Sequence, residues 1–372
     1  MESLKVGIIG CGNISRIYLE NQQRFANYKV VAIADLLIER AQERAEEFGI
    51  AKAYTTEELL ADPTIDLVVN LTIPAVHADI AKQALEHGKH VYGEKPLAVE
   101  REDGKEILEL AQQKGLYVGN APDTFLGAGL QTCKKLIEDG WIGTPISATG
   151  FMMVPGHERW HPDPAFYYQR GGGPLFDMGP YYITALVALM GPIKRVTGSA
   201  QITYPERTIT SEPKFGETIT VETPTQINSV LDFESGAVCS LVTSFDTWHH
   251  HLPNLEIYGT EGSIMVPDPN TFGGPVCVRR KNSQEWSEIP LLYGFADNSR
   301  GLGVAEMADA IITKRRSRID GELAYHVLDI MHGILESSET SRHYQTESRC
   351  PRPASLPIGF DETFLKQRKV EE

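Results

Sequence analysis

A lysine and an acid–phenol pair are the side chains in this sequence best suited to chemistry. Lys95 follows a short apolar run in Gly93-Glu94-Lys95-Pro96, and its ammonium could orient a substrate oxygen and stabilise developing alkoxide charge. Asp177 and Tyr181 are four residues apart after a Gly-rich stretch, so on a helix they share one face, where either could move a proton. The alternative is that Asp177 caps the helix and Tyr181 packs in the core. Lys95, placed between an expected strand and a proline, favours the catalytic interpretation.

A glycine-rich turn near the N-terminus has the spacing of a dinucleotide-binding loop. Gly10 and Gly12 lie between an apolar run and a helical pattern and are followed by Asn13, Ile14 and Ser15. Gly10 suits a tight turn, and Gly12 would let the backbone approach a pyrophosphate at the helix N-terminus. The small Ser15 replaces the usual third glycine and still allows close packing of helix on strand.

Asp35 lies 25 residues after Gly10, at the end of the next apolar run. A carboxylate there can accept hydrogen bonds from a ribose diol, and its charge would repel a 2′-phosphate. Leu36 and Leu37 follow, with no arginine to bind such a phosphate. We therefore expect the cofactor to be NAD rather than NADP. The alternative is a structural α/β domain that binds no nucleotide.

The elements that must position these residues alternate regularly over the first third of the chain. Four apolar runs are typical of strands, at residues 5–10, 30–35, 66–71 and 90–92. Helical patterns follow them at residues 13–25, 38–48, 76–86 and 101–114. Apolar strands that are each followed by a helix indicate a parallel sheet covered on both faces. The sequence predicts an α/β fold whose N-terminal Rossmann domain, a doubly wound parallel sheet, spans residues 1–123.

The remainder of the chain does not show this regular alternation of strands and helices. Helical patterns occur at residues 126–138, 175–190, 304–313 and 323–336. Alternating, strand-like stretches occur at residues 226–233, 237–245, 255–258 and 276–280. We predict an α+β domain at residues 124–345, built on a large, mostly antiparallel open sheet. The Pro-rich residues 346–372 should form an extended or poorly ordered tail.

The segment His157-Glu158-Arg159-Trp160-His161 matches the H-E-x-x-H pattern of zinc proteases. Prolines on both sides leave no room for the long helix that this chemistry needs, so we expect no metal site. A substrate loop is the better interpretation, with His157 and Trp160 contacting a hydroxyl and a ring face, and an ordered surface loop is the alternative. Asn120 and Asp123 should also contact substrate, on the nicotinamide side of the cleft.

Composition excludes several classes of partner. With 50 acidic and 35 basic residues the formal net charge is -15, which disfavours nucleic acid and anionic membrane surfaces. The chain shows no leader-like segment and no long apolar run, so we expect no membrane association. Its five cysteines are scattered and form no C-x-x-C pair, as in proteins of a reducing compartment. These features predict a cytoplasmic protein.

Nearly the whole chain resembles the Gfo/Idh/MocA family, named for glucose-fructose oxidoreductase, inositol dehydrogenase and a rhizopine-catabolism protein. The resemblance rests on the glycine-rich loop, the Gly-rich segment around Asp177, and four further segments: residues 72–77, 88–97, 140–143 and 257–262. It implies a Rossmann domain followed by an α+β domain whose open sheet forms a homodimer or homotetramer.

The resemblance also assigns roles to residues. The catalytic lysine of the family falls on Lys95 and its aspartate on Asp177, while its usual histidine is replaced by Tyr181, as in the sugar oxidoreductases of the family. The matching segments further imply that the cofactor contacts Lys95 and four other residues, Thr72, Pro74, His77 and Glu94.

Together these features predict an NAD-dependent oxidoreductase. It would move a hydride between nicotinamide and a hydroxyl or carbonyl carbon of a sugar, sugar derivative or cyclitol. The alternatives are an NAD-retaining glycosidase or a cofactor-recycling sugar oxidoreductase. A non-catalytic nucleotide-binding protein is a third interpretation, which the presence of Lys95 and Asp177 disfavours.

Overall fold

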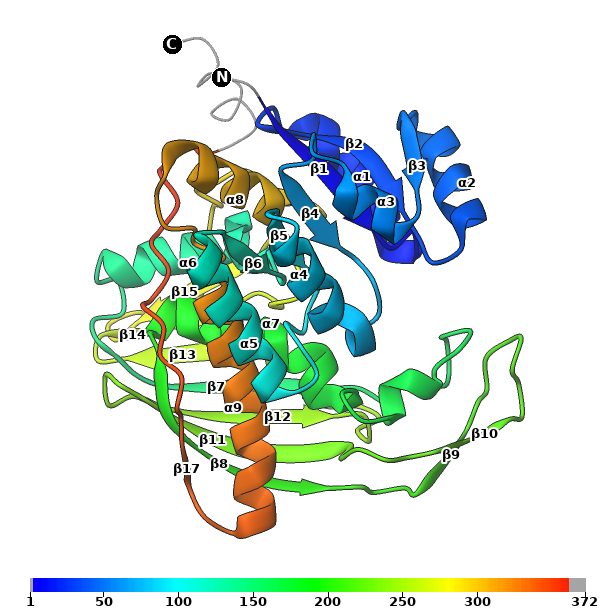
Figure 1. Cartoon of the computed structure of the whole chain (residues 1–372). Coiled ribbons are helices and arrows are strands. Elements are labelled where there is room, and N and C mark those ends of the chain that lie inside the picture. Colours follow the sequence, from blue (N-terminus) through cyan, green and yellow to red (C-terminus); the bar gives the residue numbers. More distant parts are fainter. Residues whose placement is uncertain (1–2, 361–372) are drawn as a thin grey trace. The chain divides into compact units, whose positions relative to one another are not determined.

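The computed structural model describes residues 3–360, which form two compact units (Figure 1). The first unit comprises residues 3–131, 291–325 and 353–360, and the second comprises residues 132–290 and 326–352. This division differs from the single boundary expected after residue 123, because the chain returns twice to the first unit. Helix α8 (Leu302–Thr313), which we expected in the second domain, belongs to the first unit.

The first unit is built on a six-stranded sheet in the order β3-β2-β1-β4-β5-β6, in which all neighbouring strands are parallel. Its strands are β1 (Leu4–Ile9), β2 (Tyr28–Ala34), β3 (Lys52–Tyr54), β4 (Leu67–Asn70), β5 (His90–Gly93) and β6 (Val118–Asn120). The strand order reverses between β1 and β4, which is the doubly wound arrangement. The predicted Rossmann fold is therefore confirmed.

Helices connect these strands. They are α1 (Asn13–Asn21), α2 (Ile38–Phe48), α3 (Thr56–Ala61), α4 (His77–Glu86) and α5 (Arg101–Lys114), with the short 3-10 helices η1 (Gln22–Arg24), η2 (Pro74–Val76) and η3 (Thr124–Leu126). α4 and α5 pack against each other, and α8 contacts β2 and β6. The predicted bounds of α2 and α5 are confirmed, whereas β3, α3 and β6 were not predicted.

The second unit contains a nine-stranded sheet in the order β16-β15-β14-β13-β7-β12-β11-β8-β17. Its strands are β7 (Pro145–Met153), β8 (Ile193–Gln201), β11 (Gln226–Phe233), β12 (Val238–Ser244), β13 (Leu255–Gly259), β14 (Gly262–Val266), β15 (Val276–Arg280), β16 (Ser287–Ile289) and β17 (Tyr344–Gln345). Every neighbouring pair is antiparallel except β7 and β12, so the predicted mostly antiparallel sheet is confirmed. A separate hairpin pairs β9 (Glu206–Thr208) with β10 (Thr218–Thr220).

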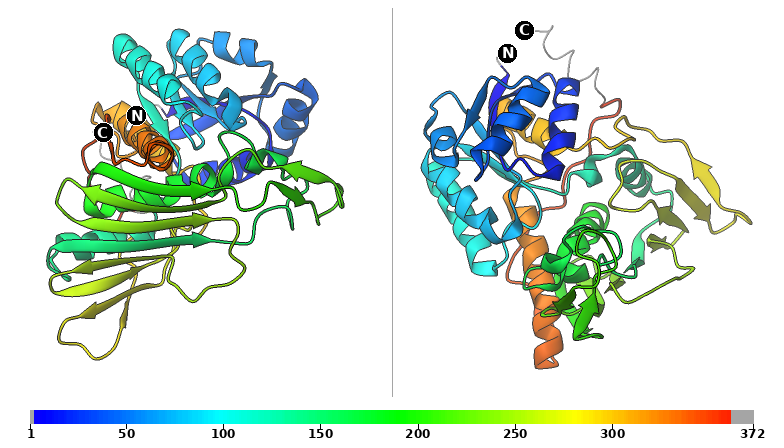
Figure 2. Two further views of the ribbon diagram at one scale, coloured as in Figure 1. Left: turned by 90° about the horizontal axis from the view of Figure 1, so that it is seen from below. Right: turned by 90° about the vertical axis from the view of Figure 1, so that its right-hand side faces the viewer.

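One face of this sheet is covered by α7 (Gly173–Met190), which contacts β7, β11 and β12 (Figure 2). Side chains that point toward this face are buried, as Leu231 and Leu241 show. Val230 and Val238 point the other way and are exposed. The unit also holds η4 (Ala165–Tyr168), most of α9 (Gly321–Thr340) and most of α6 (Ala128–Glu138).

The tail after residue 345 is extended, and its described part packs against the protein. In residues 346–360, which contain no helix or strand, Cys350, Leu356 and Phe360 are buried. Poor order was therefore the wrong alternative for this part, and residues 361–372 lie outside the described residues. None of the helices within residues 3–360 combines the length and apolarity needed to cross a bilayer.

Candidate active site

The glycine-rich loop of the first unit leaves open space at the N-terminus of α1. Gly10 has a φ of 103°, and a Cβ there would lie 2.6 Å from the Leu71 carbonyl oxygen, so a side chain at this turn is excluded. Gly12 is the N-cap of α1, and no atom lies within 4 Å of the position its Cβ would take. Asn13 is exposed and Ile14 half-buried at the start of the same helix. Backbone N–H groups that face open space at a helix N-terminus are suited to a pyrophosphate.

Asp35 lies beside this loop, at the end of β2. Its carboxylate accepts hydrogen bonds from the backbone N–H groups of Cys11 at 2.8 Å and Leu37 at 3.0 Å. The side chain is only partly buried, and the neighbouring Leu36 is 95% exposed. The carboxylate therefore both fixes the loop and stands where a ribose diol would lie relative to a bound pyrophosphate.

The segment after β4 is held by a buried histidine. The Nδ1 atom of His77 lies 2.8 Å from the Pro96 carbonyl oxygen, and its Nε2 atom lies 3.0 Å from the Thr72 carbonyl oxygen. Burial lowers the pKa of His77. His77 is 2% exposed and joins two loops. This burial disfavours the cofactor contact that the resemblance implied. Thr72 and Pro74 remain half-buried at the carboxyl edge of the sheet.

Lys95 lies directly after β5, at the same carboxyl edge. It is half-buried, and its peptide bond to Pro96 is cis. Glu94 accepts hydrogen bonds from the Tyr18 hydroxyl at 2.9 Å and from the Lys95 backbone N–H at 3.1 Å. Asn120 donates its side-chain amide to the carbonyl oxygens of Gly93, at 3.0 Å, and Glu94, at 2.8 Å. Glu94 and Asn120 thus fix the backbone that carries Lys95.

Asp123 does not line an open cleft. Its side chain is 2% exposed, and one carboxylate oxygen accepts hydrogen bonds of 3.0 Å from the backbone N–H groups of both Gly301 and Gly303. These groups belong to the start of α8, so Asp123 caps that helix. Burial raises its pKa to about 6. Asp123 is a structural residue, and the expected substrate contact was wrong.

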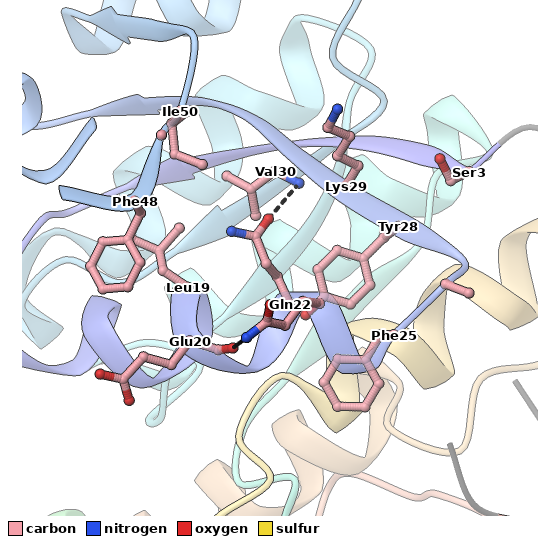
Figure 3. A pocket seen from close by; sticks show the side chains of 13 residues that line it. Ser3, Leu19, Glu20, Gln22, Phe25, Tyr28, Lys29, Val30, Phe48 and Ile50 are labelled. Carbon is pink, nitrogen blue, oxygen red and sulfur yellow. Dashed lines mark hydrogen bonds between the residues drawn. The ribbon is translucent and has the colours of Figure 1, made fainter. Parts of the chain in front are cut away.

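A separate hollow in this unit lies away from these residues. It has a volume of about 580 Å³ and is lined by 13 residues, among them Ser3, Leu19, Tyr28 and Phe48 (Figure 3). Ser3 and Tyr28 stand where β1 and β2 begin, which is the amino edge of the parallel sheet. Gly10, Asp35 and Lys95 follow the opposite ends of their strands, so this hollow is not the dinucleotide site.

In the second unit, α7 presents the predicted acid–phenol pair. Asp177 and Tyr181 are one turn apart on this helix, and Asp177 is partly exposed while Tyr181 is buried. The Nε2 atom of His157 lies 3.1 Å from the Asp177 Oδ2 atom. The sequence did not predict this contact, which joins two residues that we had assigned to different roles.

The ring of His157 is fixed by its surroundings. It packs against the rings of Trp160, Tyr167 and Phe245, with centroid distances of 5.2, 4.2 and 4.5 Å. Its Nδ1 atom is buried and has no hydrogen-bond partner within the described residues. A bare acceptor nitrogen tolerates that environment better than an N–H group does. This arrangement favours the tautomer in which Nε2–H donates to the Asp177 carboxylate.

The backbone of this loop is held by a buried ionic network. Glu158 accepts hydrogen bonds from the Tyr168 hydroxyl and from Arg207, whose guanidinium also binds Asp246. Glu158 is therefore not available as a base, and residues 157–161 form a turn rather than a helix. Both observations remove the geometric basis for zinc-protease chemistry. Among residues 3–360 no three His, Cys, Asp or Glu side chains are grouped as metal ligands.

Beside this loop the surface is hollowed. A cavity of about 400 Å³ is lined by residues of one continuous segment, Val154, Pro155, Gly156, His157, Arg159 and Trp160. Trp160 is 61% exposed. His157 thus contributes to the wall of this cavity and also contacts Asp177. A ligand in the cavity would be separated from the Asp177 carboxylate by one side chain.

The fold and these residues define a Rossmann-fold oxidoreductase with an added α+β unit. The chain belongs to the Gfo/Idh/MocA family. The N-terminal domain of the family, described as "Oxidoreductase family, NAD-binding Rossmann fold", matches residues 4–121, and the C-terminal domain of the family matches residues 130–265.

Individual relatives agree with this assignment. The chain is 28% identical to a 1,5-anhydro-D-fructose reductase of Ensifer adhaerens, over 77% of this chain and 82% of that protein. It is also 28% identical to the scyllo-inositol 2-dehydrogenase (NAD(+)) of Bacillus subtilis, over 71% and 73%. An NAD binding oxidoreductase from Klebsiella pneumoniae has the same fold, with a TM-score of 0.82, 23% identity, and coverage of 93% of this chain and 99% of that chain.

Proposed function

We propose that this protein is an NAD-dependent dehydrogenase or reductase that acts on a carbinol or carbonyl carbon of a sugar-like substrate. One observation carries the proposal: a carboxylate, Asp177, is held by His157 one helical turn from the hydroxyl-bearing Tyr181. If Asp177 only stabilised the fold, its carboxylate would not need to be oriented next to the Tyr181 hydroxyl, a second group that can transfer a proton. The relatives named for anhydrofructose and scyllo-inositol support a polyhydroxylated substrate.

NAD(H), when bound, supplies nicotinamide C4 as the hydride acceptor or donor. The backbone N–H groups at Gly12, Asn13 and Ile14 would bind its pyrophosphate, and Asp35 would bind the ribose diol next to adenine. The open space at Gly12 fits this group, since a backbone can approach a phosphate closely there.

The remaining steps belong to side chains of the protein. Tyr181 as the phenolate accepts the hydroxyl proton when the carbinol is oxidised, and as the neutral phenol it donates that proton to the oxygen when the carbonyl is reduced. Asp177 accepts a hydrogen bond from a substrate hydroxyl and is oriented by the Nε2–H group of His157. Lys95 stabilises the negative charge that develops on the substrate oxygen. His157 and Trp160 contribute the adjoining wall of the substrate site.

Two further features of the chain support a homo-oligomeric assembly and a cytoplasmic location. The open face of the nine-stranded sheet exposes Val230 and Val238 among polar residues, and a second copy of this face would cover them in a homodimer or homotetramer. The five cysteines are free within the described residues, as is usual in the cytoplasm.

A substrate screen tests the proposal. The purified protein is offered sugars, sugar acids and cyclitols with NAD, and NADH absorbance is followed. We expect turnover with at least one class and no turnover for Lys95→Ala. If no compound in any class is oxidised, and no matching ketone is reduced with NADH, the protein binds a nucleotide without catalysis.

A further inference from the structure

Arg159 carries a charge that no residue in the described part of the chain neutralises. Its side chain forms no hydrogen bond and no ion pair within residues 3–360. Its guanidinium carbon lies 4.5 Å from the centre of the Trp248 ring, so the cation is supported on an aromatic face. An arginine without a counterion is unexpected here, because the chain has a formal net charge of -15.

The charged neighbours of Arg159 are already paired. Glu158 binds Arg207 at 2.8 Å, and Asp163 binds Lys214 at 2.8 Å. Asp246, two residues before Trp248, also binds Arg207. Glu158 and Asp246 thus share Arg207, Asp163 binds Lys214, and none of these three carboxylates forms an ion pair with Arg159.

Arg159 also belongs to the wall of the cavity described above. The same wall contains Trp160 and His157, and His157 contacts the proposed catalytic Asp177. Trp248 and Trp160 are 62% and 61% exposed, so two indole rings face solvent beside the guanidinium. Trp160 lines the cavity and Trp248 supports the guanidinium of Arg159, and exposed aromatic side chains at a cavity next to proposed catalytic residues indicate a ligand surface.

The chemistry of a stacked guanidinium limits what this ligand is. Contact with the indole face restrains the guanidinium and leaves N–H groups for hydrogen bonds to a ligand. That edge matches two oxygens of a carboxylate or a phosphate, which it can bind in bidentate fashion. A neutral hydroxyl group can accept one of these N–H groups, but it does not neutralise the charge.

We propose that Arg159 recognises an anionic substituent on the substrate, so that the protein acts on acidic sugars in preference to neutral ones. This inference rests on the proposed function and names its substrate class. The shared chemistry is an oxyanion on a polyhydroxylated carbon chain, supplied by the carboxylate of a sugar acid or by a sugar phosphate.

Matched substrates and variants test this directly. D-glucose, D-glucuronate and glucose 6-phosphate are compared as substrates with NAD, and D-gluconate is added as a carboxylate at the other end of the chain. Binding of each is measured separately by calorimetric titration of the NADH-bound protein. The variants are Arg159→Gln and Arg159→Lys, with Arg280→Gln on β15 as a control that removes one exposed arginine elsewhere in the same unit.

We expect at least one anionic sugar to bind more tightly than glucose. Arg159→Gln should weaken its binding by roughly 10- to 100-fold, the usual worth of hydrogen bonds to a charged group. Arg159→Lys should recover part of the loss, Arg280→Gln should change nothing, and raising the salt concentration should weaken binding in the wild type more than in Arg159→Gln. The glucuronate and glucose 6-phosphate arms distinguish carboxylate from phosphate.

The two proposals fail in different ways. If glucose is oxidised as efficiently as every acidic sugar and Arg159→Gln has no effect, the anion site is wrong and the dehydrogenase stands. If an anionic sugar binds through Arg159 but nothing is oxidised or reduced, the anion site stands and the dehydrogenase is wrong. Since Arg159 is exposed, its variants should keep the thermal midpoint of the wild type, which confirms that they fold.

Discussion

The Nε2 atom of His157 lies 3.1 Å from the Asp177 Oδ2 atom, and the two residues come from a loop and a helix of the same unit. A partly buried hydrogen bond to a carboxylate fixes the direction in which that carboxylate points. The contact makes Asp177 an ordered acceptor, and it gives His157 a role that does not require it to touch the substrate. His157 is in this sense a positioning residue.

Two variants of His157 distinguish the effect of its hydrogen bond to Asp177 from the effect of the packing of its ring. His157→Gln keeps an N–H donor at about the position of Nε2, whereas His157→Phe keeps only the packing against Tyr167 and Phe245. With an identified substrate, we expect kcat/KM to fall by roughly 10- to 100-fold in His157→Phe and by much less in His157→Gln. A role in folding alone predicts equal rates for both variants once their thermal midpoints are matched.

Labelled histidine gives a second measurement that does not depend on turnover. The nitrogen chemical shifts of His157 should show the proton on Nε2, and Asp177→Asn should disturb this tautomer. A spectrum with the proton on Nδ1 in the wild type would contradict the proposed hydrogen bond.

Tyr181 and Asp177 can be distinguished by two conservative variants. Tyr181→Phe removes only the hydroxyl and keeps the buried ring, so substrate affinity should change little. The turnover rate should fall by roughly 10²- to 10⁴-fold, the usual worth of a positioned acid or base. If Tyr181→Phe keeps most of the rate while Asp177→Asn loses it, the proton passes to Asp177 and the tyrosine only packs.

Cofactor preference depends on Asp35. Because its carboxylate would bind the ribose diol and repel a 2′-phosphate, NAD(H) should bind at least tenfold more tightly than NADP(H), which is about 1.4 kcal/mol. Calorimetric titration checks this, and equal or reversed affinities would refute it.

Asp35→Asn serves as the matched variant for this cofactor prediction. It keeps an oxygen that can accept from Cys11 or Leu37 N–H and removes the charge. It should narrow the difference between the two cofactors mainly by improving NADP(H) binding.

The sequence predicted the parallel sheet because its strands are apolar throughout and its helices are amphipathic. The same regularity located the residues at the carboxyl edge, since Gly10, Asp35 and Lys95 each follow a strand. β7 was missed, although it lies in the middle of the larger sheet. It begins at Pro145 and contains Gly150, where a Cβ would lie 2.9 Å from a Leu241 side-chain atom. Close packing here requires a glycine, which weakens the strand pattern.

Contacts made by loops could not be predicted in this way. His157 and Asp177 are 20 residues apart, with an irregular Pro- and Gly-rich segment between them. Asp123 binds Gly301, which is 178 residues away and was expected in another domain. No periodic pattern relates such positions, so the same polar residue types suggested a substrate contact for both Asp123 and His157.

The burial of Asp123 predicts how stability depends on pH. Burial raises its pKa from 3.8 to about 6, so the folded state holds this proton more tightly than the unfolded chain does. The resulting stabilisation is complete below pH 3.8 and is lost as the pH rises through about 6. Asp123→Asn cannot ionise but can still accept from Gly301 and Gly303. Above pH 6 it should therefore be more stable than the wild type, by roughly 2–3 kcal/mol.

Urea unfolding of the wild type and Asp123→Asn at intervals between pH 4 and pH 8 measures this effect. The two curves of stability against pH should approach each other near pH 4 and separate up to about pH 6.5. Asp123→Ala is the control, because it removes the acceptor for both N–H groups at the start of α8 and should be less stable than Asp123→Asn at every pH. Parallel curves for the wild type and Asp123→Asn would show that Asp123 ionises normally in the folded protein, and that its burial against α8 does not alter its charge.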